Sequence, residues 1–80
     1  MNQSHELDDM DLEPSSEDIV ITTEGRLGCR YVAYYSGRAI ATAIEYGDVE
    51  TMLKTWMETN KYWPSIWILS DHGNFHLTTI

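Results

Sequence analysis

The sequence is poor in basic residues, and this shortage limits what it can bind. Its 80 residues include only five Lys and Arg against 13 Asp and Glu, which gives a net charge of −8. Nucleic-acid phosphates need clustered basic partners, and five scattered cations do not provide them. We therefore expect no direct binding of DNA or RNA.

Cysteine and long apolar runs are scarce as well. The single cysteine, Cys29, excludes an intramolecular disulfide framework and leaves too few thiols for a cysteine zinc site. We expect it to fill a core position in a strand rather than to act as a nucleophile. No run approaches the roughly 18 apolar residues of a membrane-spanning helix, and the N-terminus lacks the basic start and apolar stretch of a signal peptide. These features predict a cytoplasmic protein that does not enter a membrane.

The acidic residues, by contrast, are concentrated at one end. Seven of the 13 lie within positions 1–18, without a Lys or Arg among them: Glu6, Asp8, Asp9, Asp11, Glu13, Glu17 and Asp18. Residues 19–80 hold six acids and five bases, so the first part carries −7 and the second −1. Mutual repulsion and few large apolar side chains predict that residues 1–18 form a disordered acidic tail on a single domain of residues 19–80.

Three strands are predicted at the start of this domain. Residues 19–23 are mostly β-branched, and residues 29–35 and 38–44 flank Ser36-Gly37, a pair typical of a two-residue hairpin turn. Pairing Tyr35 with Arg38 would give the hairpin two different faces. One face would carry Cys29, Tyr31, Ala33 and Tyr35 with Arg38, Ile40, Thr42 and Ile44; the other would carry Arg30, Val32 and Tyr34 with Ala39, Ala41 and Ala43.

A helix is predicted over residues 48–60, with Asp48 as its N-cap and Asn60 at its end. Its apolar residues repeat at helical spacing: Val49, Met52, Leu53, Trp56 and Met57. Two further strands, residues 66–69 and 75–79, flank a turn at residues 71–74. The order β-β-β-α-β-β predicts a two-layer α+β domain in which one amphipathic helix packs on a twisted antiparallel sheet.

The helix could cover either face of this sheet. We favour the face with the greater aliphatic bulk, which complements the helix stripe: Cys29, Tyr31, Ala33, Ile40, Ile44, Ile66 and Ile68. The opposite face would then be open, with Arg30, Val32, Tyr34, Trp67 and the alanines, and apolar enough to serve as an interface with a partner or a second copy of the chain. Alternatively, the alanines could let the helix dock closely on that face.

No pattern in the sequence points to catalysis, a metal or a cofactor. His72 and His76 have the spacing of metal ligands on a helix, but Gly73 and Asn74 place a turn between them. Ser65 and Ser70 lack the strand-turn-helix context of a nucleophilic serine, and the glycines never form a phosphate-binding run. We therefore expect a protein that is not an enzyme and holds no cofactor.

The acidic tail and the open face remain as the candidate binding features. In an extended chain, Asp9, Asp11 and Glu13 would stand about 6.6 Å apart, on the scale of successive phosphates. The tail could therefore imitate a nucleic-acid backbone, with a folded anchor supplying specificity, or it could simply keep the protein soluble. The residues predicted to bind a partner are Asp8, Asp9, Asp11 and Glu13 in the tail, and Arg30, Tyr34 and Trp67 on the open face.

In size, acidity and architecture, with a sheet over residues 19–46 and 66–79 and one helix over residues 48–60, the chain resembles the small phage-encoded anti-CRISPR proteins. That group shares no motif, so the resemblance assigns no residue a role. It implies a stoichiometric inhibitor that binds an RNA-guided surveillance complex, often a multi-subunit type I complex, in the host cytoplasm and blocks target DNA at basic surfaces. A small intracellular regulatory module, such as an antitoxin or an adaptor, is the alternative.

Overall fold

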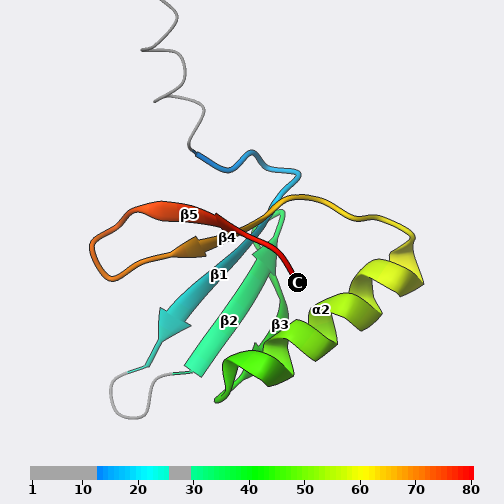
Figure 1. Ribbon diagram of the computed structural model, residues 1–80, viewed down its shortest axis with the longest axis horizontal. Coiled ribbons are helices and arrows are strands. Elements are labelled where there is room, and N and C mark those ends of the chain that lie inside the picture. The colour runs from blue at the N-terminus through cyan, green and yellow to red at the C-terminus, as the bar shows by residue number, and fades with distance from the viewer. Residues whose placement is uncertain (1–12, 26–29) are drawn as a thin grey trace, which may run out of the picture.

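The computed structural model describes residues 13–25 and 30–80, which form one layer of helix on one layer of sheet (Figure 1). Strands β1 (Ile19–Glu24), β2 (Arg30–Tyr35) and β3 (Arg38–Ala43) precede helix α2 (Tyr46–Asn60), and strands β4 (Ile66–Leu69) and β5 (Phe75–Thr78) follow it. The α+β class and the order β-β-β-α-β-β are thus confirmed. The last strand ends one residue earlier than predicted.

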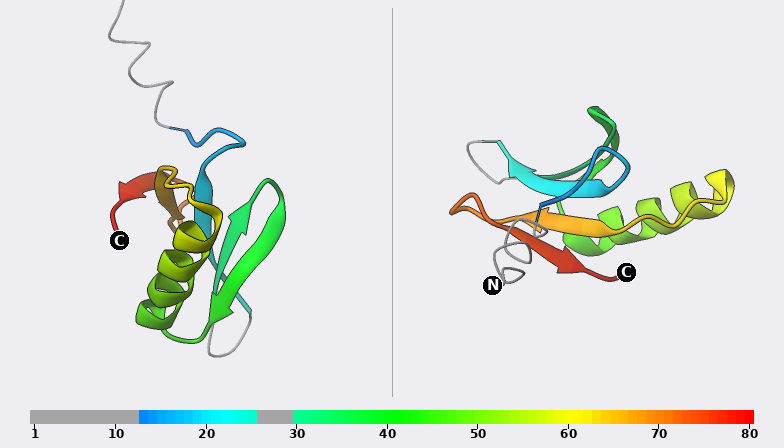
Figure 2. Two further views of the ribbon diagram at one scale, coloured as in Figure 1. Left: turned by 90° about the vertical axis from the view of Figure 1, so that its right-hand side faces the viewer. Right: turned by 90° about the horizontal axis from the view of Figure 1, so that it is seen from above.

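The sheet is mixed, whereas the sequence predicted an antiparallel one. Its strand order is β3-β2-β1-β4-β5, and β4 lies parallel to β1 while the other neighbours are antiparallel. The cause is the helical connection: α2 runs back along the sheet after β3, so that β4 starts from the same end as β1 (Figure 2). This crossover places β1 at the centre of the sheet.

The β2–β3 hairpin has the predicted turn and a bulge that was not predicted. Tyr35 pairs with Arg38, and Ser36 and Gly37 both have positive φ, 54° and 80°. The register then shifts, because Tyr34 pairs with Ala39 but Ala33 pairs with Ala41. Ile40 is the extra residue of a β-bulge, and beyond it every side chain of β3 moves to the other face.

This bulge changes what the helix contacts. The favoured face is confirmed by Tyr31, Ala33, Ile40, Ile66 and Ile68, which all belong to or pack against the core under α2. Ala41 and Ala43 lie there too, contrary to the predicted register, and Thr42 is exposed. Ile44 was wrongly placed in the core, since the strand ends before it and its side chain is 73% exposed. Cys29 lies outside the described residues.

Helix α2 begins two residues earlier than predicted. Its N-cap is Glu45, which makes no side-chain capping bond, and Asp48 lies within the first turn, where its carboxylate still faces the positive end of the helix dipole. The end at Asn60 is confirmed, with Lys61 in the left-handed conformation. The apolar stripe is narrower than predicted, because Met52 is exposed and Trp56 only half-buried. The buried helix residues are Val49, Leu53 and Met57.

Candidate partner-binding surface

The residues predicted to bind a partner do not form a single exposed patch. Asp8, Asp9 and Asp11 lie outside the described residues. Glu13 and Arg30 are exposed, Tyr34 is half-buried, and Trp67 is buried, with only 7% of its surface accessible. Tyr34 and Trp67 do share the face opposite α2, since both pair with Val20 of β1. Arg30 and Tyr34 line one hollow on this face, because the Tyr34 side chain extends towards the end of β2 where Arg30 lies.

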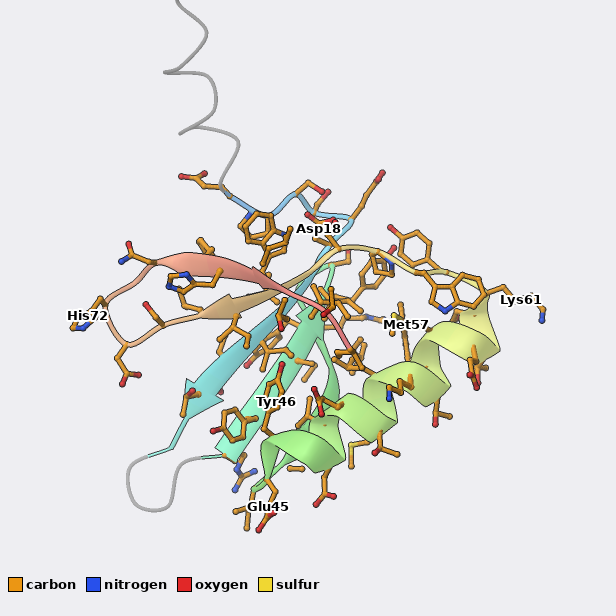
Figure 3. All side chains as sticks on the ribbon, in the orientation of Figure 1. Asp18, Glu45, Tyr46, Met57, Lys61 and His72 are labelled. Carbon is orange, nitrogen blue, oxygen red and sulfur yellow. The ribbon has the colours of Figure 1, made fainter. Side chains whose placement is uncertain are left out.

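Trp67 is buried although it lies on the face opposite α2, and it holds the residues that precede β1. Its indole Nε1–H donates to the Asp18 carboxylate at 3.0 Å, and the same carboxylate oxygen accepts from the Ser15 backbone N–H at 3.1 Å. Figure 3 shows Asp18 near the end of the sheet where β1 begins. The expectation that Trp67 is an exposed contact residue is therefore wrong, because it anchors the chain's own N-terminal side.

Two bonds to the linker between α2 and β4 strengthen this attachment. The Tyr62 hydroxyl donates to the Glu17 carbonyl at 2.7 Å, and the Ile19 N–H donates to the Ser65 carbonyl at 2.9 Å. Residues 15–18 are therefore attached to the domain, although the sequence assigned them to the disordered tail. The boundary of the attached region lies before Ser15.

Tyr62 of this linker also packs against two aromatic side chains of the domain. Tyr35 lies 5.1 Å from Trp56 and 5.7 Å from Tyr62, between ring centroids, and Trp56 and Tyr62 are 6.4 Å apart. They connect the hairpin, the last turns of α2 and the linker. Burial, followed by the neighbouring Tyr35, raises the pKa of Tyr62. The hydroxyl therefore keeps its proton, and can donate to the Glu17 carbonyl, up to a higher pH than an ordinary tyrosine.

Tyr34 is held on the open face by Glu24. Its hydroxyl donates to the Glu24 carboxylate, which also accepts from the Thr22 hydroxyl at 2.8 Å. The Tyr34 bond is the main cause that lowers the pKa of Glu24, followed by the Thr22 bond, and it raises the pKa of Tyr34. Glu24 pairs with Arg30, whereas Tyr34 pairs with Val20. The Tyr34 side chain therefore extends along β2 towards Arg30 to reach the Glu24 carboxylate. Val32, on this face, is only 6% exposed.

Two exposed apolar side chains, Trp63 and Leu77, were not among the residues that the sequence predicted to bind a partner. Trp63 is 65% exposed and Leu77 is 63% exposed. Trp63 precedes Pro64, which favours an extended path rather than a helix, but this signal does not tell whether the side chain is exposed. Leu77 pairs with Trp67 across β4 and β5, so strand alternation could have identified it as a residue of the open face.

Within residues 13–25 and 30–80, no three His, Cys, Asp or Glu side chains are grouped so that they could hold a metal ion. His72 and His76 are both exposed, the first in the β4–β5 turn and the second on β5. The Ser70 hydroxyl is used in that turn, where it accepts from the Asn74 N–H. No helix in the described part of the chain is both long and apolar enough to cross a bilayer.

No protein-family model, curated protein or solved structure matches this chain.

Proposed function

We propose that this protein is a non-catalytic inhibitor that binds a basic nucleic-acid-binding surface of another protein and blocks nucleic acid from that surface. The observation that carries the proposal is the charge distribution. Of the net charge of −8, the acidic tail holds −7. The tail meets the domain at a defined place, because Asp18 bonds Trp67 and Glu17 bonds Tyr62.

The physics of such binding favours this division of charge. A polyanion is attracted to a basic channel over several ångströms, which speeds association, and it replaces the nucleic acid's own phosphates as counter-charge. The domain is nearly neutral, so it adds little repulsion or attraction of its own. Because residues 15–18 are already attached to the domain, binding incurs no further entropic cost for ordering them.

As the partner we propose an RNA-guided CRISPR surveillance complex in the cytoplasm of a phage-infected host. The support is the resemblance to small anti-CRISPR proteins in size, acidity and two-layer architecture. An antitoxin or adaptor is the second candidate, because exposed Trp63 and Leu77 would suit contact with any folded partner. A toxin gene beside the coding sequence would favour this second candidate over the first.

The test is capture followed by competition. The tagged protein is used as bait in lysate from a CRISPR-bearing host, with mass spectrometry of what it retains. A variant with Asp8→Asn, Asp9→Asn, Asp11→Asn and Glu13→Gln serves as the matched control. We expect the native chain to retain the surveillance complex and the control variant to retain much less of it. We also expect target DNA to compete with the native chain for the complex. Target DNA that binds alongside the protein without displacing it would contradict the proposal.

A further inference from the structure

An apolar groove lies between the end of α2, the following linker and the C-terminal end of the chain. Its volume is about 300 Å³, and its apolar lining is Met57, Trp63, Pro64, Ile66, Leu77 and Ile80. Met57 is labelled on α2 in Figure 3, and the chain's C-terminus approaches the helix in Figure 1. Met57 and Ile66 belong to the core, so the groove opens directly onto rigidly packed side chains.

Two large apolar side chains that line this groove are exposed. Trp63 and Leu77 leave 65% and 63% of their surfaces in water, an arrangement typical of residues that are buried on binding. The groove also lies beside β5, an edge strand of the sheet. An edge strand can pair with an extended segment of another chain, whose side chains then enter neighbouring pockets.

The charge near the groove indicates what kind of segment would fit. The linker that lines the groove with Trp63, Pro64 and Ser65 also bonds the end of the acidic tail, through Tyr62 to Glu17 and through Ser65 to Ile19. The linker therefore lies between the groove and the segment that carries the Glu17 and Asp18 carboxylates, of which that of Asp18 already accepts from Trp67 and Ser15. Lys61, at the start of the linker, offsets only one of these charges.

We infer that the groove and the attached end of the acidic tail form one docking surface for an extended segment of the partner, in which one apolar side chain has Lys or Arg within two residues. The apolar side chain enters the groove between Trp63 and Leu77, and the basic side chains reach the carboxylates across the linker. This inference rests on the proposed function, since it names the part of a basic partner that the domain would hold.

The test uses a defined probe with the full-length, ¹⁵N-labelled protein. The probe is a synthetic ten-residue peptide with a central leucine and lysines at the flanking positions, titrated to millimolar concentration. We expect NMR shift changes at the Trp63 indole and at the amides of Leu77 and Thr78. Peptides in which leucine is replaced by serine, or the lysines by glutamate, should bind about tenfold more weakly or not at all. Absence of shifts at the groove, or equal binding of the glutamate peptide, would overturn the inference.

Matched variants locate the site. Trp63→Ala and Leu77→Ser should each weaken the binding of the lysine-containing peptide about tenfold or more. Ile44→Ser is the control, because Ile44 is 73% exposed and does not line the groove. An equal loss in all three variants would contradict a localised site.

The two proposals fail separately. A protein that displaces target DNA from its partner but leaves the peptide unbound would disprove only the docking surface. Peptide binding in the groove, without displacement of DNA from any captured partner, would disprove only the inhibitory function.

Discussion

At the scale of single residues, Leu53 illustrates how the helix is held. Its side chain is completely buried between Val49 and Met57 on the face of α2 that meets the sheet, whereas the neighbouring Lys54 is exposed. Leu53→Ala should destabilise the domain by about 3 kcal/mol, because it removes buried apolar surface and leaves a cavity. Lys54→Ala should change the free energy of unfolding by less than about 0.5 kcal/mol. Urea titration measures both, and equal midpoints would contradict the assigned helix face.

Glu24 provides a pH-dependent readout of the open face. Its pKa is lowered chiefly by the Tyr34 hydroxyl and secondarily by the Thr22 hydroxyl. A lowered carboxyl pKa stabilises the fold above the group's ordinary pKa, and this stabilisation is lost as the pH falls through the lowered value. Tyr34→Phe should therefore raise the pKa of Glu24 towards its ordinary value, with a smaller rise in Thr22→Val. NMR titration of the carboxyl carbon measures the change, and an unaltered pKa in Tyr34→Phe would disprove the bond.

At the scale of the elements, the β2–β3 turn makes a backbone prediction. Ser36 and Gly37 both have positive φ, the requirement of a type I′ turn, in which Asn-Gly is preferred. Ser36→Asn should stabilise the domain by a few tenths of a kcal/mol, since asparagine adopts positive φ more readily than serine. Gly37→Ala should destabilise it by about 1 kcal/mol, although an added Cβ would meet nothing within 4 Å. Thermal unfolding that ranks the two variants the other way would contradict this turn.

The attachment of residues 15–18 makes a prediction about truncation. Removal of residues 1–12 should leave the thermal midpoint nearly unchanged, because it keeps the bonds that Glu17 and Asp18 make to the domain and removes a segment with few large apolar side chains. Removal of residues 1–18 should lower the midpoint by roughly 5 °C or more, because the Trp67 indole and the Tyr62 hydroxyl lose their partners. Equal midpoints for the two truncations would show that these bonds contribute nothing to stability.

The sequence predicted the elements well because local signals specify them. Alternation, the Ser36-Gly37 turn and the helical stripe each act within a few residues. The bulge at Ile40 escaped prediction because no Gly or Pro marks it, and its register follows from packing against α2. The parallel pairing of β1 with β4 depends on the path of the whole crossover, which local patterns do not specify.

The candidate site was predicted less well, for a related reason. An aromatic residue in a strand looks the same from sequence whether it faces a partner or the chain's own N-terminal side. Trp67 is covered because Asp18, 49 positions away, bonds its indole. Trp63 is exposed in the linker that follows α2, and Leu77 is exposed on the edge strand β5, where it pairs with Trp67 on the face that α2 does not cover. Such long-range arrangements become visible only in the folded chain.

At the scale of the whole molecule, charge and apolar surface are divided between different parts. The acidic tail holds almost all of the net charge, and the domain holds the exposed Trp63 and Leu77. If this division serves binding, the tail should govern how fast the partner is found, and the apolar side chains should govern how long it is held.

The most direct test measures binding kinetics to the captured partner at two ionic strengths. The native chain is compared with the variant that carries Asp8→Asn, Asp9→Asn, Asp11→Asn and Glu13→Gln. We predict that the native association rate falls steeply with added salt, and that the variant associates about tenfold more slowly with a flatter salt dependence and a similar dissociation rate. An association rate that is indifferent to salt and equal in the two proteins would contradict the account.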